Sequence, residues 1–444
     1  MSATSSTETS APAAVDRTPA YSWFVLFILC LVYILNFLDR QLVAILGELI
    51  KTDLNLTDGE LGMLGGIVFA AFYTIIGVPV GWLADRTNRV RILALGCFLW
   101  SLSTFLCGRS TNFTTLAIAR MGVGFGEAGG APPSYSIISD YFAKEKRGTA
   151  LALFSLGVPF GQALGAFFGA DIAENYGWRQ AFIVLGLIGI VMSVVVLVLV
   201  REPKRGAMDV KLDVHMTEAP TTALDDDKPR FGRTLKEFFS RPSLVYLALG
   251  CGATAFVGYA ILQWTVSFLI REKGIDYNAV KLYYALILAI PMGLGGLFAG
   301  IVVDKLGKTN KAAYALVPAA AMAVCIPFYI WFLRAPTWES ALAILAIPTF
   351  LNFFYLAPAL AVVQNGVRPS QRTMSGALLL MILNLIGLGG GPTFIGFLSD
   401  YYAKTHGDRS LGMALHWLVP VYVIAVVFFL LEARALKKEE VRTY

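Results

Sequence analysis

The chain has 444 residues, of which 57% are hydrophobic and only 15% are charged, and its formal net charge is +6. Soluble globular domains contain about 45–50% apolar and about 25% charged residues, so this composition excludes an ordinary soluble protein. Such a chain is stable where lipid covers much of its surface, because a helix of about 20 apolar residues crosses the hydrocarbon core of a bilayer.

Apolar segments recur along the whole chain at lengths that suit transmembrane helices. A polar tail, 1–20, comes first and contains no signal-peptide core. Six segments follow within 21–200, and a polar linker, 201–240, leads to six more within 241–436 and a short tail, 437–444. The predicted helices are 21–48, 59–84, 90–108, 112–141, 147–171, 178–200, 242–270, 279–303, 311–333, 339–365, 373–400 and 410–435. We therefore expect an all-α membrane protein with twelve transmembrane helices in two pseudo-symmetric six-helix bundles.

The positions of the basic residues predict the orientation of the chain. If the N-terminus is cytoplasmic, the segments on the inner side contain 25 of the 36 lysines and arginines, in agreement with the positive-inside rule. Both tails and the linker are then cytoplasmic, and the plasma membrane is the expected location. An amphipathic stretch from Phe231 to Phe239 is expected to lie on the membrane surface. Because this bias accounts for the net positive charge, we expect no nucleic-acid partner.

Two loops with related patterns follow apolar segments in the two halves. The loop 81–91, GWLADRTNRVR, joins the second and third predicted helices, and a weaker copy, GIVVDKLGK, stands at 300–308. Positive-inside charge explains the arginines alone, but it does not explain the Gly-x-x-x-Asp-Arg-x-x-Arg spacing and its echo. Glycine, aspartate and arginine at this spacing can form contacts between helices that stabilise one conformation of the two halves and break in the other conformation. We predict conformational gating by Gly81, Asp85, Arg86, Arg89, Asp304 and Lys305.

Four charged residues lie well inside predicted helices, namely Asp39, Arg40, Arg120 and Glu127. A charge near the bilayer centre costs at least about 2.5–3.5 kcal/mol, so it normally faces a partner or a cavity. Asp39 and Arg120 are expected at similar depth, where they could pair, with Glu127 about 10 Å deeper. A carboxyl in a low-dielectric cavity readily takes up a proton. We assign Asp39 and Glu127 to proton coupling and Arg40 and Arg120 to anion binding; static ion pairs that only fix helix packing are the alternative.

Polar residues in the second set of helices either line a central cavity or form hydrogen bonds between helices. We assign five of them to substrate binding, with hydrogen bonding between helices as the open alternative: Tyr259, Gln263, Asn352, Tyr355 and Asn384.

The sequence contains no recognisable catalytic or cofactor-binding motif. A GxGxxG match at 124–129 lies inside an apolar helix without the preceding strand that dinucleotide binding needs. The chain has neither HExxH nor GxSxG, and its five cysteines show no CxxC spacing. We expect no enzyme activity and no cofactor beyond a proton gradient.

The loop at 81–89 resembles the signature loop of the major facilitator superfamily, and RMGVGFGEA at 120–128 resembles the fourth-helix motif of that family. The resemblance extends over all twelve predicted helices and implies two repeated halves that move about a central site. Within the superfamily, NFLDR at 36–40 and GEAG at 126–129 resemble the spinster family. That resemblance implies a lysophospholipid or sphingoid-phosphate substrate, driven in at least some members by protons. Organic-anion symporters of the superfamily carry a similar Asp-Arg pair.

Together these patterns predict a secondary active transporter that works by alternating access, as a monomer in the lipid bilayer. The expected substrate is a lysophospholipid or a similar amphipathic anion, moved with protons. A proton-coupled symporter of small organic anions is the alternative. A channel or membrane receptor is a hypothesis of a different class, although a channel has no need of two matched gating loops.

Overall fold

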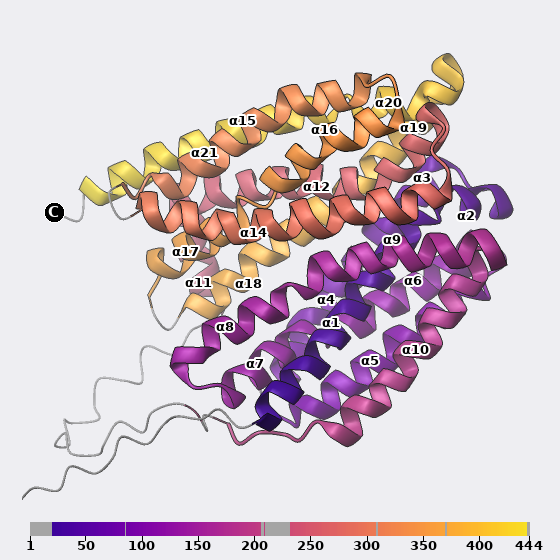
Figure 1. The fold of residues 1–444 in the computed structure, drawn as a ribbon. Helices are drawn as coiled ribbons and strands as arrows, with labels where there is room; N and C mark the ends of the chain where they lie inside the picture. The colour runs from indigo at the N-terminus through magenta and orange to yellow at the C-terminus, as the bar shows by residue number, and fades with distance from the viewer. Residues whose placement is uncertain are drawn as a thin grey trace, which may run out of the picture.

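The computed structural model describes residues 20–84, 86–205, 208, 231–307, 310–368 and 371–441. Asp85 of the predicted gating loop lies outside the described residues, as do the end of its echo at 308, most of the linker, nearly all of the N-terminal tail and the last three residues, 442–444. The described chain is helical throughout, with two bundles of helices that pack side by side (Figure 1). The prediction of an all-α membrane fold is therefore confirmed.

The N-terminal bundle contains α1 to α10, which account for the first six predicted spans. Three of these spans consist of two consecutive helices each: α3 with α4, α6 with α7, and α8 with α9. The bounds are α1 Ala20–Ile45, α2 Gly47–Leu54, α3 Asp58–Gly65, α4 Ile67–Ala84, α5 Arg89–Gly108, α6 Phe113–Glu127, α7 Ala131–Tyr141, α8 Lys144–Ser155, α9 Gly157–Tyr176 and α10 Trp178–Leu199.

The C-terminal bundle contains the other six spans, several of them also interrupted. Short π-helical segments, η1 and η3, occur in two of these spans. The bounds are α11 Phe231–Ser240, α12 Pro242–Lys273, α13 Tyr277–Ala279, η1 Val280–Tyr284, α14 Ala285–Gly307, α15 Ala313–Arg334, α16 Trp338–Leu351, α17 Leu356–Gly366, α18 Arg372–Ile382, η3 Leu383–Gly390, α19 Gly391–His406, η4 Gly407–Arg409, α20 Ser410–Leu415 and α21 Leu418–Val441.

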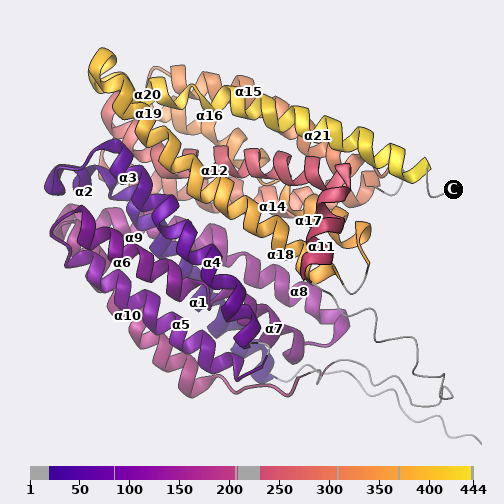
Figure 2. The same cartoon turned by 180° about the vertical axis from the view of Figure 1, so that it is seen from behind.

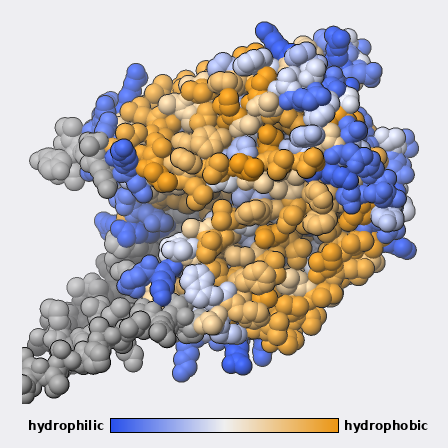
Figure 3. Space-filling view, viewed as in Figure 1, coloured by the Kyte–Doolittle hydropathy of each residue, from blue (hydrophilic) through white to orange (hydrophobic). Residues whose placement is uncertain are grey.

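Ten segments of the described chain are long and apolar enough to cross a membrane. One of them, Met374–Glu439, contains the last two predicted spans, and the segment of α6 and α7, which carries Arg120 and Glu127, is not among the ten. Figure 3 shows a broad apolar surface between two hydrophilic ends. Large side chains such as Ile75, Val198 and Ile301 are more than half exposed on the molecule, as lipid contact requires.

Glycines allow the helices of each bundle to approach closely. A Cβ added to Gly161 of α9 would lie 2.5 Å from the Ile34 carbonyl oxygen of α1, and one added to Gly165 would lie 2.8 Å from that of Leu38. Such close approach is typical of small residues at four-residue spacing in membrane helices.

The amphipathic helix α11 packs against α12 and α18. Its Phe238 is buried, and its Phe239 is exposed.

The two bundles meet along an interface that has two different ends. We name them the Asp58 end, with α2, α3, the α12–α13 turn and α20, and the Arg89 end, with the α4–α5 turn, α7, α8, α11, α17 and α18. Figure 2 shows α3, α19 and α20 together at the first end and α8, α11 and α18 at the second. The helix α21 runs toward the Arg89 end, where its last residue, Val441, lies (Figure 1).

Candidate transport site

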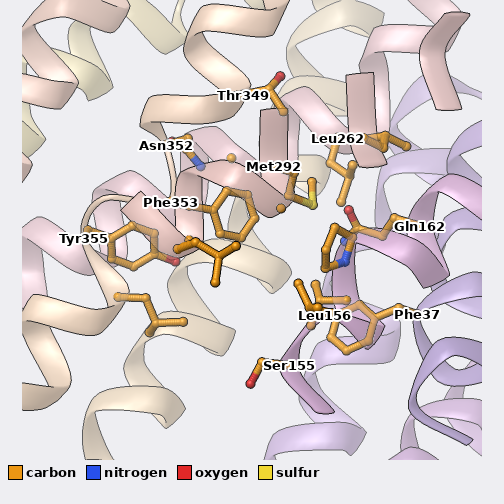
Figure 4. Close-up of a pocket in the computed structure, with 18 of the residues that line it drawn as sticks. Phe37, Ser155, Leu156, Gln162, Leu262, Met292, Thr349, Asn352, Phe353 and Tyr355 are labelled. Carbon is orange, nitrogen blue, oxygen red and sulfur yellow. The ribbon is translucent and has the colours of Figure 1, made fainter. Parts of the chain in front are cut away.

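A cavity of about 530 Å³ lies between the two bundles. Its N-terminal wall comes from α1, α7, α8 and α9, and its C-terminal wall from α12, α14, α16 and α17. Figure 4 shows Phe37, Leu156, Leu262, Met292 and Phe353 around the cavity, together with the polar side chains of Ser155, Gln162, Thr349, Asn352 and Tyr355. The size and the mainly apolar lining suit a drug-sized or lipid-like molecule.

A second, smaller cavity of about 30 Å³ adjoins the large one. The two share four lining residues, Phe37, Gln162, Tyr259 and Leu262. The smaller cavity adds a polar set that the larger one does not have: Arg40, Gln41, Arg120 and Gln263. A mainly apolar chamber therefore borders a chamber that holds two guanidinium groups.

The buried charges pair differently from the expectation. The Arg40 Nε donates to the Glu127 Oε2 at 2.5 Å, while Asp39 accepts a hydrogen bond from the Thr104 hydroxyl at 2.7 Å. No ion pair within 4 Å joins Asp39 to Arg120, although both belong to the described chain. Asp39 and Arg120 therefore form no direct ion pair in this structure, although their charges act on each other. The direct pair joins the next residue of α1, Arg40, to the end of α6.

Arg120 is 1% exposed, and no carboxylate oxygen of the described residues lies within 4 Å of its nitrogens, although the charges of Asp39 and Glu127 act on it from further away. Its Nε lies 3.4 Å from the Leu64 carbonyl oxygen, and its Nη1 has no hydrogen-bond partner. The guanidinium lies over the Phe69 ring at 5.0 Å, and Arg40 lies over the same ring at 5.0 Å. The cation–π contacts offset only part of the cost of burial, so Arg120 is a buried cation with an unfilled donor.

Four of the five polar residues assigned to the second half line these cavities. Tyr259 faces both, Gln263 faces the smaller one, and Asn352 and Tyr355 face the larger one. Asn384 lies in η3 and lines neither. The residue that η3 contributes to the smaller cavity is Leu388, one turn further along the helix.

Sequence reasoning missed two glutamines of the smaller cavity, Gln41 and Gln162, and Ser155 and Thr349 of the larger one. One signal was available for Gln41. It follows Arg40 directly and stands four residues after Phe37, so it belongs to the same side of α1.

The predicted gating loop makes its described contacts with the N-terminal bundle and with the first residues of the linker. The Arg89 Nη1 donates to Asp140 at 2.5 Å and its Nε donates to Glu202 at 2.7 Å. Arg86 stacks on the Trp82 ring at 4.2 Å. These contacts hold the ends of α5, α7 and α10 together. They join no residue of the C-terminal bundle, so the gating role of Arg86 and Arg89 stays a prediction.

The other predicted gating residues have open surroundings. No described atom outside the neighbouring backbone lies within 4 Å of a Cβ added to Gly81. Asp304 and Lys305, in the last turn of α14, are both exposed. Their gating roles also stay predictions.

Ion pairs between the bundles occur at the Asp58 end. Arg271 of α12 donates to both oxygens of Glu48, at 2.9 and 2.7 Å, and to both oxygens of Asp58, at 2.7 Å each. Lys51 donates to the same Asp58 carboxylate at 2.6 Å. The Asp58 side chain is only 4% exposed, so its charge depends on these partners.

The start of α3 is bound to α19 of the other bundle. The Asp400 carboxylate accepts from the backbone N–H of Asp58 at 2.9 Å and of Gly59 at 2.7 Å. The Ser399 hydroxyl donates to Asp58 at 2.6 Å. An aspartate from one bundle thus caps the N-terminus of a helix in the other, where the free N–H groups favour an anion.

Comparison with known proteins agrees with this architecture. Residues 29–392 match the Major Facilitator Superfamily. An MFS-type efflux pump of Mycolicibacterium smegmatis is 29% identical over 96% of this chain and 97% of its own length. Protein spinster homolog 1 of Xenopus laevis is 29% identical over 95% of this chain and 82% of its own length.

Among solved structures, a bacterial homolog of the human lysosomal transporter Spinster, in an inward-facing and unoccupied conformation, aligns with a TM-score of 0.83 and 28% identity. The alignment covers 95% of this chain and 99% of that one. The family match, the helical architecture and the cavity between two bundles lead to one conclusion: the chain belongs to the Major Facilitator Superfamily, as a spinster-like secondary transporter of the membrane.

Proposed function

We propose that this protein moves an amphipathic anion across the membrane with protons, a lysophospholipid being the first candidate. The observation that carries the proposal is the pair of adjoining cavities. The smaller contains Arg40 and Arg120, which suit an anionic headgroup, and the larger has a mainly apolar wall, which suits an alkyl chain. The proposed transporter works as a monomer, with the whole site in one chain.

The shape of the interface supports entry of a chain from the side. The helices α9 and α14 approach each other where Pro159 lies 3.6 Å from a Cβ added to Gly293. One turn further along α14, Gly296 lines the large cavity and has no described atom within 4 Å of an added Cβ. An alkyl chain is expected to lie between α8 and α14, in contact with the bilayer.

Proton coupling is proposed to act through the Arg40–Glu127 pair. While Glu127 is ionised, its 2.5 Å bond with Arg40 holds that guanidinium. Protonation of Glu127 removes this charge and frees Arg40 for a substrate anion. Proton binding and anion binding then favour each other, so the proposed cycle is symport. Asp39, bonded to Thr104, is the second candidate for a proton.

The Glu127→Gln variant tests this step. Its neutral side chain mimics the protonated acid, so we expect anion binding to persist and to lose its dependence on pH. Purified protein in liposomes, supplied with lysophosphatidic acid and an imposed pH gradient, gives the measurement. Gradient-driven accumulation in the variant equal to that of the unchanged protein would contradict the coupling role.

The Arg120→Ala variant tests the headgroup assignment. A hydrogen bond to a charged group contributes about 2 kcal/mol, so binding of lysophosphatidic acid should weaken about thirtyfold while the protein still folds. Thermal unfolding in detergent serves as the control for the fold. Unchanged affinity would remove Arg120 from the site.

A symporter of small organic anions is the second candidate, and the small size of the arginine-lined cavity favours it. Uptake of dicarboxylates without any uptake of lysolipids would favour this second candidate over the lysophospholipid transporter.

We also propose that the protein lies in the plasma membrane with both tails in the cytoplasm. This orientation makes the large cavity open toward the cytoplasm in this structure.

A further inference from the structure

Three glutamine side chains from three helices meet at the smaller cavity: Gln41 of α1, Gln162 of α9 and Gln263 of α12. They are 1%, 5% and 6% exposed. Each has a buried amide atom without a hydrogen-bond partner, namely Nε2 of Gln41, Oε1 of Gln162 and Nε2 of Gln263. Gln41 also lies beside the Tyr284 phenol, but its Nε2 forms no hydrogen bond of normal geometry.

Buried polar atoms are nearly always hydrogen-bonded in proteins, so three unfilled amides at one cavity point to a ligand. Their neighbour Arg120 contributes an unfilled Nη1 donor at the same cavity. The backbone leaves space for this arrangement. A Cβ added to Gly65 would lie 2.2 Å from the Gln263 Oε1, so the absence of a side chain there admits the amide.

The hydrogen-bonding groups of the three glutamines and Arg120 limit which chemical groups can bind in the smaller cavity. A phosphate or carboxylate oxygen only accepts, so it suits Arg120 and the amide donors but leaves the Gln162 carbonyl oxygen unfilled. A hydroxyl both donates and accepts, as an amide does. A volume of about 30 Å³ holds roughly two groups of the size of water. One anionic oxygen and one hydroxyl beside it fill that space.

We propose that Gln41, Gln162 and Gln263 recognise a hydroxyl group next to the anionic group of the substrate, and so select hydroxylated anions over their deoxy analogues. The inference rests on the proposed function, in which Arg40 and Arg120 hold the anion. It applies to both candidate classes, because glycerol-based lysophospholipids carry a free hydroxyl near the phosphate and many small dicarboxylates are hydroxylated.

Two matched pairs of probes test the inference. The first pair is 1-oleoyl-glycerol 3-phosphate and 3-oleoyloxypropyl phosphate, which share the chain and the phosphate but differ in the free hydroxyl. The second pair is glucarate and adipate, which share six carbons and two carboxylates. Binding to the full-length protein is measured in detergent, and transport in liposomes.

We expect the hydroxylated member of at least one pair to bind at least about tenfold more tightly, because a site built to bond a hydroxyl rejects the analogue that lacks it. In Gln162→Leu and Gln263→Leu the preference should fall below about threefold, with the deoxy analogue bound as before. Gln180→Leu is the matched control, since Gln180 is an exposed residue of α10 and should keep the preference.

The outcomes separate this inference from the proposed function. If the unchanged protein binds the two members equally in both pairs, or if Gln162→Leu and Gln263→Leu keep the full preference, the glutamines do not recognise a hydroxyl, and the anion-transport proposal stands. If the unchanged protein binds none of the four anions, the proposed function fails and this inference fails with it. If Arg120→Ala weakens the binding of both members of a pair, and the glutamine variants weaken only the binding of the hydroxylated member, the anionic group and the hydroxyl are recognised by different residues.

Discussion

The two ends of the interface contain similar residue types, glycines and charged side chains, but use them differently. At the Asp58 end, Arg271 and Asp400 of the C-terminal bundle bind Glu48, Asp58 and the start of α3 in the N-terminal bundle. At the Arg89 end, the buried Arg89 binds Asp140 of its own bundle and Glu202 at the start of the linker. A charge cluster therefore indicates a gate only when its partners lie on opposite sides of the moving interface.

The glycines show the same contrast. At the Asp58 end, a Cβ added to Gly62 would lie 2.5 Å from the Pro392 carbonyl oxygen, and one added to Gly396 would lie 2.3 Å from that of Asp58. Toward the Arg89 end, Gly77, Gly81 and Gly296 have no described atom within 4 Å of an added Cβ. The structure is thus closed at the first end and open at the second, in agreement with its similarity to an inward-facing structure.

The largest effect on this contrast is expected from Arg271→Ala. Removal of one partner from a largely buried ion cluster costs about 3 kcal/mol, or roughly a hundredfold in an equilibrium. Since Glu48 and Asp58 would lose the same partner, the variant should favour the state that is open at the Asp58 end. Distances by pulsed electron paramagnetic resonance between labels at the exposed Tyr176 and Tyr401 give the populations.

Arg179→Ala is the matched control for that experiment. Arg179 binds Asp53 within the N-terminal bundle and at the same end of the molecule, so its removal should leave the label distances unchanged. Equal shifts in the two variants would show that the Arg271 contacts do not act as a lock.

A smaller effect, of opposite sign at the two ends, is expected from adding single methyl groups. Gly62→Ala places a Cβ against the α19 backbone, and overpacking of this kind costs about 2 kcal/mol, so the closed Asp58 end should open. Gly81→Ala meets no described atom in this state. If Gly81 packs against the other bundle in the opposite state, as gating requires, this variant should favour the present state.

The same label distances test the glycine pair, with a second label pair at Glu145 and Lys236 to report on the Arg89 end. A shift by Gly81→Ala toward the state open at the Asp58 end would contradict the predicted role of the 81–91 loop.

The smallest effect is expected from Asp400→Asn. The amide keeps an acceptor oxygen for the N-terminus of α3 but loses the charge, which contributes about 1 kcal/mol at a helix N-terminus, or roughly a fivefold change in population. Asp276→Asn is the control. Asp276 accepts from the Ala279 N–H at the start of α13, within one bundle, so the same exchange there should change stability without moving the two states.

Much of the fold was predictable because its signals are local. Apolar segments of sufficient length form helices in lipid, where each backbone group must be bonded within its own segment. The rarity of charge in such segments also marked Asp39, Arg40, Arg120 and Glu127. The cavity positions of Tyr259 and Gln263 followed from polarity within α12, whereas Asn384, equally polar, lies in η3 outside both cavities.

The membrane segments and the charges within them could be identified from the amino-acid sequence, because the hydropathy of a segment depends only on the residues in it. The partners of those charges became known from the packing of the helices. Glu127 follows Arg40 by 87 residues and Asp400 follows Asp58 by 342. Whether two such groups meet depends on how helices rotate and pack, and no local pattern records it. Asp39, which we expected beside Arg120, therefore forms a hydrogen bond with Thr104. The ion pairs of Arg271 with Glu48 and Asp58, between the bundles, lie at the opposite end from the 81–91 loop.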